Sequence, residues 1–255
     1  MNIAVSVAEQ QFVSQAQQLA QTLALPFIQY DQIPHYDAIL LHTLAGLKLT
    51  WPKQKQNLHI DFLRGKNNHR RFFSGGYKQL IARACAVKKN APPTILDATA
   101  GLGSDAFALA CLGCHIHLIE RSPLIAALLS DALSRLRTNT TLYKGISLHL
   151  TPGNACHIMQ AIDSEKKPDI VYLDPMHPIQ RRSALAKKEM RLLRGIVGSD
   201  DDANNLFIHA LECAQKRIVV KRPRFAAPLN EHKPDLVYSG QSSRFDVYLI
   251  SVRAK

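Results

Sequence analysis

Hydrophobic and polar positions follow different patterns before and after residue 75. In the first part, short apolar runs are separated by turn residues such as Pro34, Gly46 and Pro52, a pattern typical of short strands joined by tight turns. One helix is predicted over residues 11–23. Strands are predicted over residues 27–30, 38–42, 47–51 and 58–63. Residues 1–74 are therefore expected to form a small mixed α+β N-terminal subdomain.

From residue 75 onward, apolar runs alternate with segments of helical periodicity. Strands are predicted over residues 94–97, 115–120, 146–151, 169–174 and 217–221, and helices over 77–87, 104–112, 123–136, 183–197 and 200–214, with a short helix near Asn154. Repeated β-α units indicate a mostly parallel, doubly wound sheet with helices on both faces. A final hairpin, 236–239 and 245–252, predicts an antiparallel edge strand. Residues 75–255 are expected to form this α/β domain, with its ligand beyond the carboxyl ends of the strands.

A glycine-containing turn follows the first of these strands. The strand ends at Asp97, and Gly101 and Gly103 then allow the backbone to approach a ligand closely before the next helix begins. The following strand ends in Glu120, about twenty residues later. An acid at this position can accept hydrogen bonds from the ribose hydroxyls of an adenosine. The turn therefore predicts a nucleoside-containing cofactor.

Two cofactors fit this turn. The run from Gly101 to Ala106 formally matches the dinucleotide fingerprint, but a pyrophosphate requires amide donors and no nearby carboxylate. Asp97 ends the strand and Asp105 opens the helix. S-adenosylmethionine carries no phosphate, and carboxylates favour its ammonium and sulfonium groups. The acids favour S-adenosylmethionine, and a dinucleotide stays the alternative.

A second turn follows the fourth predicted strand of this domain. Asp174 ends the strand, and Pro175 and Pro178 stiffen the residues after it. The Asp174 carboxylate and carbonyl can converge on one exocyclic base amine, whose lone pair is a poor nucleophile until its hydrogens are bonded. Alignment and exclusion of water supply the rest of the catalysis. The pair of turns predicts methyl transfer to such an amine.

Composition indicates the type of partner and does not change the predicted fold. The chain has 32 Lys and Arg against 20 Asp and Glu, a net charge of +12. This excess favours a polyanion, since each neutralised phosphate releases counterions. The first residues do not predict a signal peptide, and the sequence contains no apolar run of membrane-spanning length. We expect a cytoplasmic protein that does not bind a membrane. We also expect no bound metal, because the sequence does not contain two pairs of metal ligands at the spacing of a zinc site.

Basic residues at two places are predicted to hold an RNA backbone. The predicted helix 183–197 carries three of them on one stripe at helical spacing, and two more follow the strand 217–221 at the same sheet edge. Such contacts position RNA without reading its sequence. The residues are Lys187, Arg191, Arg194, Lys221 and Arg222.

Four segments together resemble the ribosomal RNA small subunit methyltransferase J family. They are Asp97-Ala-Thr-Ala-Gly-Leu-Gly103, Tyr172-Leu-Asp-Pro-Met176, Lys187-Lys-Glu-Met-Arg191 and Val219-Val-Lys-Arg-Pro223. The resemblance covers roughly residues 72–252. It implies a Rossmann-like class I methyltransferase that uses S-adenosylmethionine to methylate the 2-amino group of a guanine in small-subunit (16S) ribosomal RNA, free or in the 30S particle.

The resemblance also implies roles for individual residues. Asp174 and Pro175 form the catalytic turn, in which His177 takes the place of an aromatic residue that stacks on the target base. The cofactor contacts that it adds to those of the two turns are Ser104, Asp105, Arg121, Asn154 and Ala155, together with Asp174 itself.

Two other functions stay open on the sequence alone. One is a NAD(P)-dependent oxidoreductase, which the glycine turn permits. The other is a non-catalytic RNA-binding assembly factor, which the basic charge permits.

Overall fold

The computed structural model describes residues 1–64, 76–139, 145–175, 195 and 203–250. Contacts divide the chain into two compact units. The first contains Met1–Asp61 and Ser122–Asn139, and the second contains Phe62–Arg121 and most of the later chain. The division of the chain into domains at residue 74 stays a prediction.

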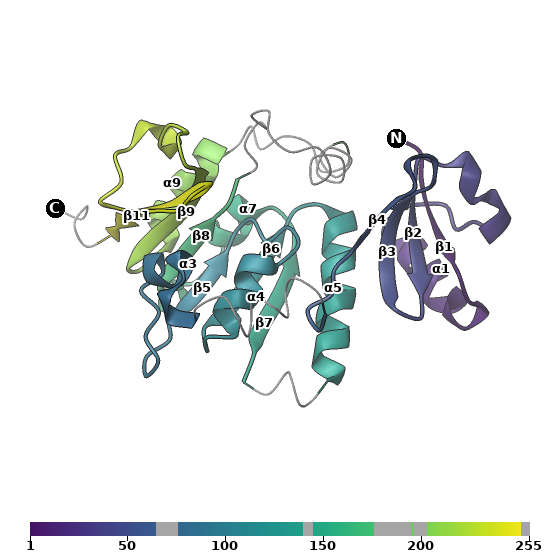
Figure 1. The fold of residues 1–255 in the computed structure, drawn as a ribbon, viewed down its shortest axis with the longest axis horizontal. Helices are drawn as coiled ribbons and strands as arrows, with labels where there is room; N and C mark the ends of the chain where they lie inside the picture. The colour runs from purple at the N-terminus through teal and green to yellow at the C-terminus, as the bar shows by residue number, and fades with distance from the viewer. Residues whose placement is uncertain (65–75, 140–144, 176–194, 196–202, 251–255) are drawn as a thin grey trace. The chain divides into compact units, whose positions relative to one another are not determined.

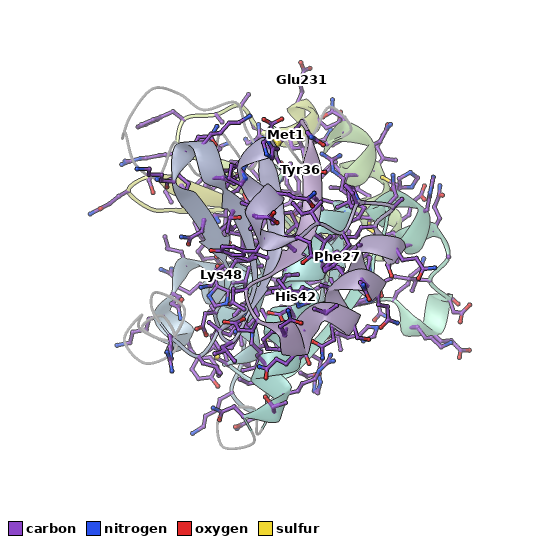
Figure 2. The ribbon with its side chains drawn as sticks, turned by 90° about the vertical axis from the view of Figure 1, so that its right-hand side faces the viewer. Met1, Phe27, Tyr36, His42, Lys48 and Glu231 are labelled. Atoms are coloured by element: carbon purple, nitrogen blue, oxygen red, sulfur yellow. The ribbon has the colours of Figure 1, made fainter. Side chains whose placement is uncertain are left out.

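A four-stranded sheet forms the body of the first unit (Figure 1). Its strands, in hydrogen-bonded order, are β1 (Ile3–Val7), β2 (Ala38–Thr43), β3 (Gly46–Trp51) and β4 (Gln56–His59). β1 is parallel to β2, and the other pairs are antiparallel. Figure 2 shows the side chains of this sheet, with His42 on β2 and Lys48 on β3 labelled.

Helix α1 (Val13–Thr22) follows a 3-10 turn, Gln10–Phe12, close to the prediction for residues 11–23. The predicted strand over residues 27–30 is wrong. Phe27 makes only an isolated bridge to Val5, and a 3-10 helix, Tyr30–His35, begins directly afterwards. The sheet contains β1 instead, a strand that the sequence analysis did not predict. Local capping decides this: the Gln29 and Gln32 side chains bond each other's backbone at the start of the 3-10 helix.

A helix from the middle of the chain completes the first unit. In α5 (Pro123–Thr138), Asp131 Oδ2 accepts hydrogen bonds from the Leu47 N–H of β3 (3.1 Å) and from Arg135 Nε (2.8 Å). Arg135 also donates through Nη2 to the Ile60 carbonyl. The bonds from α5 to Leu47 and Ile60 join residues more than 70 positions apart. Hydrophobic periodicity cannot predict such contacts.

The second unit contains a seven-stranded sheet with an antiparallel edge, as predicted. Its strands, in hydrogen-bonded order, are β10 (Leu236–Ser239), β11 (Ser243–Leu249), β9 (Arg217–Pro223), β8 (Ile170–Leu173), β5 (Thr94–Asp97), β6 (His115–Glu120) and β7 (Ser147–Pro152). β9, β8, β5, β6 and β7 run parallel, whereas β11 is antiparallel to both its neighbours.

Helices cover both faces of this sheet (Figure 1). α3 (Leu80–Ala84) and α4 (Ser104–Ala110) contact one face, and α7 (Ala155–Gln160) and α9 (Ala203–Cys213) pack together on the other. The helix predicted over 77–87 is shorter than expected, consisting of a 3-10 turn, Gly76–Lys78, followed by α3. The helix predicted over 183–197 lies outside the described residues.

Side chains of the central strands alternate between these two helical layers. On β8, Val171 and Leu173 join the apolar cluster around Phe207 of α9, whereas the Tyr172 hydroxyl bonds Asp105 of α4. On β9, Ile218 and Val220 join the same α9 cluster. The period of two therefore sends the last residues of β9 to opposite faces of the sheet.

Among the helices that the structure describes, none has the length and apolar character needed to cross a membrane.

Candidate active site

The carboxyl ends of neighbouring parallel strands bring three acidic residues to one edge of the second unit's sheet. β8, β5 and β6 are adjacent, and they end at or just before Asp174, Asp97 and Glu120. Asp97 is opposite Tyr172 on one side and Leu118 on the other. The sheet therefore places the glycine turn, the acid-proline turn and the acid after the second strand at the same edge.

The glycine turn is held against the end of β6. Gly101 N–H donates to Glu120 Oε2 (2.8 Å), and Ala100 N–H donates to the Ile119 carbonyl (3.0 Å). Gly101 and Gly103 have φ angles of +51° and +71°, a left-handed conformation that favours glycine. Gly103 directly precedes α4. The two glycines thus perform the sharp turn that the sequence predicted.

Thr99 joins the glycine turn to the acid-proline turn. Its N–H donates to Asp97 Oδ1 (3.1 Å), and its Oγ1 accepts a hydrogen bond from Asp174 N–H (2.6 Å). Pro175, the next residue, is buried. The two turns therefore belong to a single site, which is the arrangement that the predicted chemistry requires. Thr99 was not identified from the sequence, because a threonine between two motifs carries no signal of its own.

Lys221, from the neighbouring strand β9, bridges two of the carboxylates. Its ammonium lies 2.7 Å from Asp105 Oδ2 and 2.8 Å from Asp174 Oδ2. Tyr172 also donates its hydroxyl to Asp105 Oδ2 (2.8 Å). Burial alone would lower the pKa of Lys221, but Asp174 and Asp105 raise it above the ordinary value. Lys221 is therefore a fixed cation that holds α4, β8 and β9 together at the site.

Asp97 is the most deeply buried acid of the cluster, with an exposed fraction of 3%. Burial raises the pKa of its carboxyl to about 8, although the Thr99 N–H opposes this shift. Asp105, Asp174 and Glu120 raise it further because they carry the same charge. A carboxyl in this environment gains most from a cationic ligand, since a nearby positive charge favours its ionised form. This fits the ammonium group of S-adenosylmethionine.

The third predicted group of cofactor contacts lies at the end of β7, which pairs with β6. Asn154 caps α7 by accepting a hydrogen bond from Cys156 N–H (2.8 Å), and Ala155 is buried in the first turn. Gly153 N–H donates to the Glu120 carbonyl (2.9 Å). The structure therefore brings the predicted cofactor residues to the ends of four neighbouring strands. They are Asp97, Gly101, Gly103, Ser104, Asp105, Glu120, Arg121, Asn154, Ala155 and Asp174.

Of the five predicted RNA contacts, the structure describes Lys221 and Arg222. His177, Lys187, Arg191 and Arg194 lie outside the described residues. Arg222 is buried and donates from Nε and Nη2 to the Ala227 carbonyl (3.1 and 2.7 Å). Lys221 contacts the Asp105 and Asp174 carboxylates, which the sequence analysis did not predict. β8 and β9 are parallel neighbours, so the residues at their carboxyl ends, Asp174 and Lys221, lie close together. A prediction that the two strands pair would have indicated this contact.

The site suits an organic cation better than a pyrophosphate. Three carboxylates near the glycine turn would repel the phosphates of a dinucleotide. Within the described parts of the chain, no group of three or more His, Cys, Asp or Glu side chains is arranged to hold a metal ion.

Comparison with known proteins agrees with this geometry. Residues 18–250 match the family described as putative SAM-dependent methyltransferase. Ribosomal RNA small subunit methyltransferase J of Coxiella burnetii (strain RSA 493 / Nine Mile phase I) is 46% identical over 250 residues, 97% of each chain. The protein of the same name from Aeromonas salmonicida (strain A449) is 48% identical over 92% of this chain and 94% of its own. The crystal structure of a SAM-dependent methyltransferase from Neisseria gonorrhoeae superposes with a TM-score of 0.74 at 35% identity, covering 96% of this chain and 95% of the other.

The raised pKa of Asp97 predicts how the stability of the fold changes with pH. Below the unfolded pKa of about 4, the carboxyl is neutral in both states and costs nothing. As pH rises towards 8, the unfolded state releases the proton first, so stability is lost. We expect Asp97→Asn to match wild type at pH 4 and to exceed it at pH 9 by on the order of a few kcal/mol. Thermal unfolding of both proteins across this range measures the difference, and an equal pH dependence would contradict the assignment.

Proposed function

Because the chain belongs to the SAM-dependent methyltransferase family that includes ribosomal RNA small subunit methyltransferase J, we propose that it methylates the exocyclic 2-amino group of a guanine in small-subunit (16S) ribosomal RNA. The observation that carries this proposal is the sharing of one site by the glycine turn and the acid-proline turn, through Thr99. The acids near the glycine turn, which favour a cationic donor, then lie close to the Asp174 carboxylate, which can orient an amine.

The methyl donor is S-adenosylmethionine, which supplies an electrophilic methyl group on a sulfonium when bound. In this proposal Asp97 faces the donor's ammonium group, because its buried carboxyl is stabilised in the ionised form by a nearby positive charge. Glu120, which already accepts from Gly101 N–H, offers its carboxylate to the ribose hydroxyls. Ser104, Arg121, Asn154 and Ala155 surround the rest of the donor at the ends of β5, β6 and β7.

Asp174 orients the acceptor amine. Hydrogen bonds from the amine to the Asp174 carboxylate and carbonyl direct the nitrogen lone pair towards the methyl group, while Pro175 keeps the turn rigid. The nitrogen–carbon bond forms as the carbon–sulfur bond breaks, and the electron pair of that bond goes to sulfur. The methylated amine then loses one proton to solvent. His177, in the same turn, is proposed to stack on the base.

Lys221 keeps Asp174 in position and ionised. Its ammonium is fixed between Asp174 and Asp105, so the Asp174 carboxylate cannot rotate freely. An ionised acid accepts hydrogen bonds from the amine more strongly than a neutral acid. Lys221 is therefore a positioning residue in this proposal rather than a contact to RNA.

The RNA substrate is proposed from the relatives' names and from the charge of the chain. A net charge of +12 favours binding to a polyanion. The proposed acceptor is the RNA itself or the assembled 30S particle, and we propose that the protein acts in the cytoplasm. Lys187, Arg191, Arg194 and Arg222 are proposed to contact the RNA backbone.

The first test of this function is the identity of the methylated nucleoside. We expect wild-type protein, labelled S-adenosylmethionine and unmodified small-subunit RNA or 30S particles to give N2-methylguanosine, detected by mass spectrometry. Asp174→Asn should lower kcat by about 100-fold, since it weakens acceptor orientation. Asp163→Asn, a change at an exposed ion pair, is the matched control. A different methylated atom would contradict the proposed acceptor, and full activity of the Asp174 variant would contradict its role.

Cofactor affinity should depend on pH through Asp97. Between pH 5.5 and 7.5 the donor's amine stays mostly protonated, while binding it requires Asp97, whose pKa is about 8, to release a proton. The Kd for S-adenosylmethionine should therefore fall by up to about tenfold per pH unit. Asp97→Asn should bind more weakly and show no such slope. Calorimetry in buffers of different ionisation enthalpy measures both the affinity and the released proton, and the absence of proton release would refute this role.

The two possible roles of Lys221 give different kinetic results. If it positions Asp174, Lys221→Met lowers kcat by about 10- to 100-fold and leaves the salt dependence of RNA binding unchanged, and Lys221→Arg recovers part of the rate. If it contacts a phosphate, the slope of log K against log salt falls by about 0.7 and kcat is preserved. We expect the first result from steady-state kinetics and RNA titrations.

A further inference from the structure

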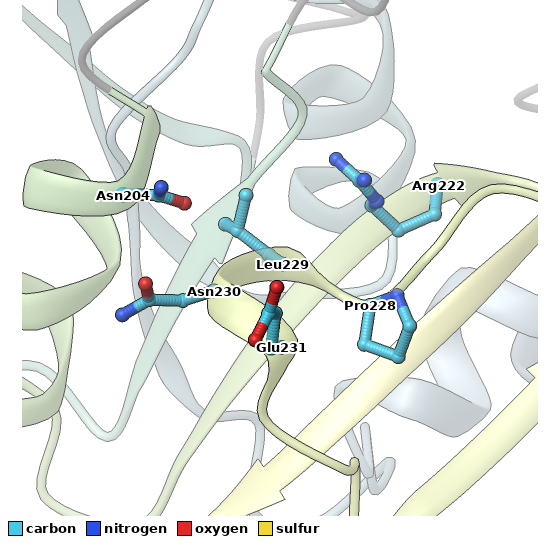
Figure 3. Close-up of a pocket in the computed structure, with 6 residues that line it drawn as sticks. All are labelled: Asn204, Arg222, Pro228, Leu229, Asn230 and Glu231. Atoms are coloured by element: carbon cyan, nitrogen blue, oxygen red, sulfur yellow. The ribbon is translucent and has the colours of Figure 1, made fainter.

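A cavity of about 390 Å³ lies near the carboxyl end of β9. Figure 3 shows the side chains around it, which come from β9, α9 and the short 3-10 turn Leu229–Glu231. The proposed active site does not include this cavity. The lining residues are Asn204, Arg222, Pro228, Leu229, Asn230 and Glu231.

Arg222 gives this cavity a buried positive charge. Its exposed fraction is 7%, and two of its three nitrogens donate to the Ala227 carbonyl. The nearby acid Asp246 is already bonded by both Nε and Nη2 of Arg244 (2.7 and 2.9 Å). In the described part of the chain, no carboxylate forms an ion pair with Arg222. A guanidinium in this position favours an anionic ligand, because a buried charge is costly until it is paired.

The other polar groups of the cavity favour a ligand that carries hydrogen-bond donors as well as a negative charge. Asn204 and Arg222 extend into the same space from α9 and β9, above Leu229 (Figure 3). Glu231 and Asn230 add a carboxylate and a second amide. A carboxylate repels a bare phosphate but accepts hydrogen bonds from hydroxyl or N–H groups. A nucleotide offers both the anion and the donors, and the volume is in the range of small-ligand pockets.

The strand geometry places this cavity at the same end of β9 as the acceptor site, on the opposite face of the sheet. Lys221 and Arg222 are consecutive on β9, about 3.3 Å apart along the strand. Lys221 contacts Asp174, whereas Arg222 lies on the face of the sheet that carries the α9 cluster, with Val220. A nucleotide in the cavity can therefore belong to the same RNA strand as a guanine at Asp174.

The loop after β9 offers a surface for an unpaired base. Phe225 is 88% exposed, and the Arg224 guanidinium lies 5.2 Å from the centre of its ring. Exposed aromatic rings and arginine planes stack with bases in single-stranded RNA. Pro228, three residues after Phe225, already lines the cavity.

We propose that this cavity is a subsite for one nucleotide that flanks the target guanine in unpaired RNA. Its phosphate pairs with Arg222, and its ribose hydroxyl or base N–H groups bind Asn204 and Glu231. This inference rests on the proposed function, since it assumes an RNA substrate.

Two neighbouring asparagines allow a closely matched test. Asn204 lines the cavity, whereas Asn205, also exposed in the first turn of α9, does not. Both Asn→Asp changes add one negative charge near a helix N-terminus, where it is tolerated. The probe is an unpaired oligoribonucleotide centred on the mapped methylated guanine, titrated at several salt concentrations. The Asn204→Asp carboxylate would compete with the phosphate for Arg222, which lines the same cavity. This variant should therefore weaken binding by about tenfold and reduce the slope of log K against log salt by about 0.7, the value for one lost phosphate contact. Asn205→Asp should change neither by a comparable amount.

Loss of the cation itself provides a second measurement. Arg222→Met should raise KM for RNA and reduce the same slope, while S-adenosylmethionine affinity stays at the wild-type value. Lys216→Met removes one charge just before β9, at the other end of the strand, and is the control. If Arg222→Met fails to fold, the comparison of Asn204→Asp with Asn205→Asp still decides the question.

The failure of this inference differs from the failure of the proposed function. Equal Kd values and slopes for Asn204→Asp and Asn205→Asp would overturn the subsite alone. A wild-type protein that transfers no methyl group to small-subunit RNA would overturn the proposed function, and this inference with it.

Discussion

The site depends on one constraint: neighbouring parallel strands must end at the same edge of the sheet. β6, β5, β8 and β9 are consecutive in the sheet. Their ends therefore bring together Glu120, Asp97, Asp174 and Lys221, although Asp97 and Lys221 are 124 positions apart in the sequence. Two further contacts then fix the details. Thr99 bonds both turns, and Lys221 holds α4 to β8 and β9 through Asp105 and Asp174. A sheet with another strand order would separate these groups.

Charge is distributed unevenly between the site and the whole molecule. The chain is strongly basic, yet four acids lie near one another at the strand ends, and two of them form ion pairs with Lys221. The net charge attracts a polyanion over long distances, whereas the local acids favour the positively charged methyl donor. Both properties are needed by an enzyme that brings a cationic donor to an anionic acceptor.

The last residues of β9 illustrate how one strand serves two places. Alternation sends Lys221 to the face that carries α4 and Arg222 to the face that carries α9. The first therefore neutralises active-site acids, and the second provides the charge of the neighbouring cavity. The adjacent basic residues that looked equivalent in the sequence have different surroundings because the side-chain period of a strand is two.

The sequence by itself determined the α/β alternation, the two turns and the acids that end their strands, because short apolar runs, glycines and prolines act locally on the backbone. It also indicated the family through four motifs. It could not determine that Thr99 and Lys221 join the site, that α5 bonds β3 through Asp131, or that β1 rather than residues 27–30 supplies a strand. Those outcomes depend on which strands become neighbours and which distant groups pair with one another. Only the tertiary structure decides such pairings, because their energies come from contacts between residues far apart in the chain.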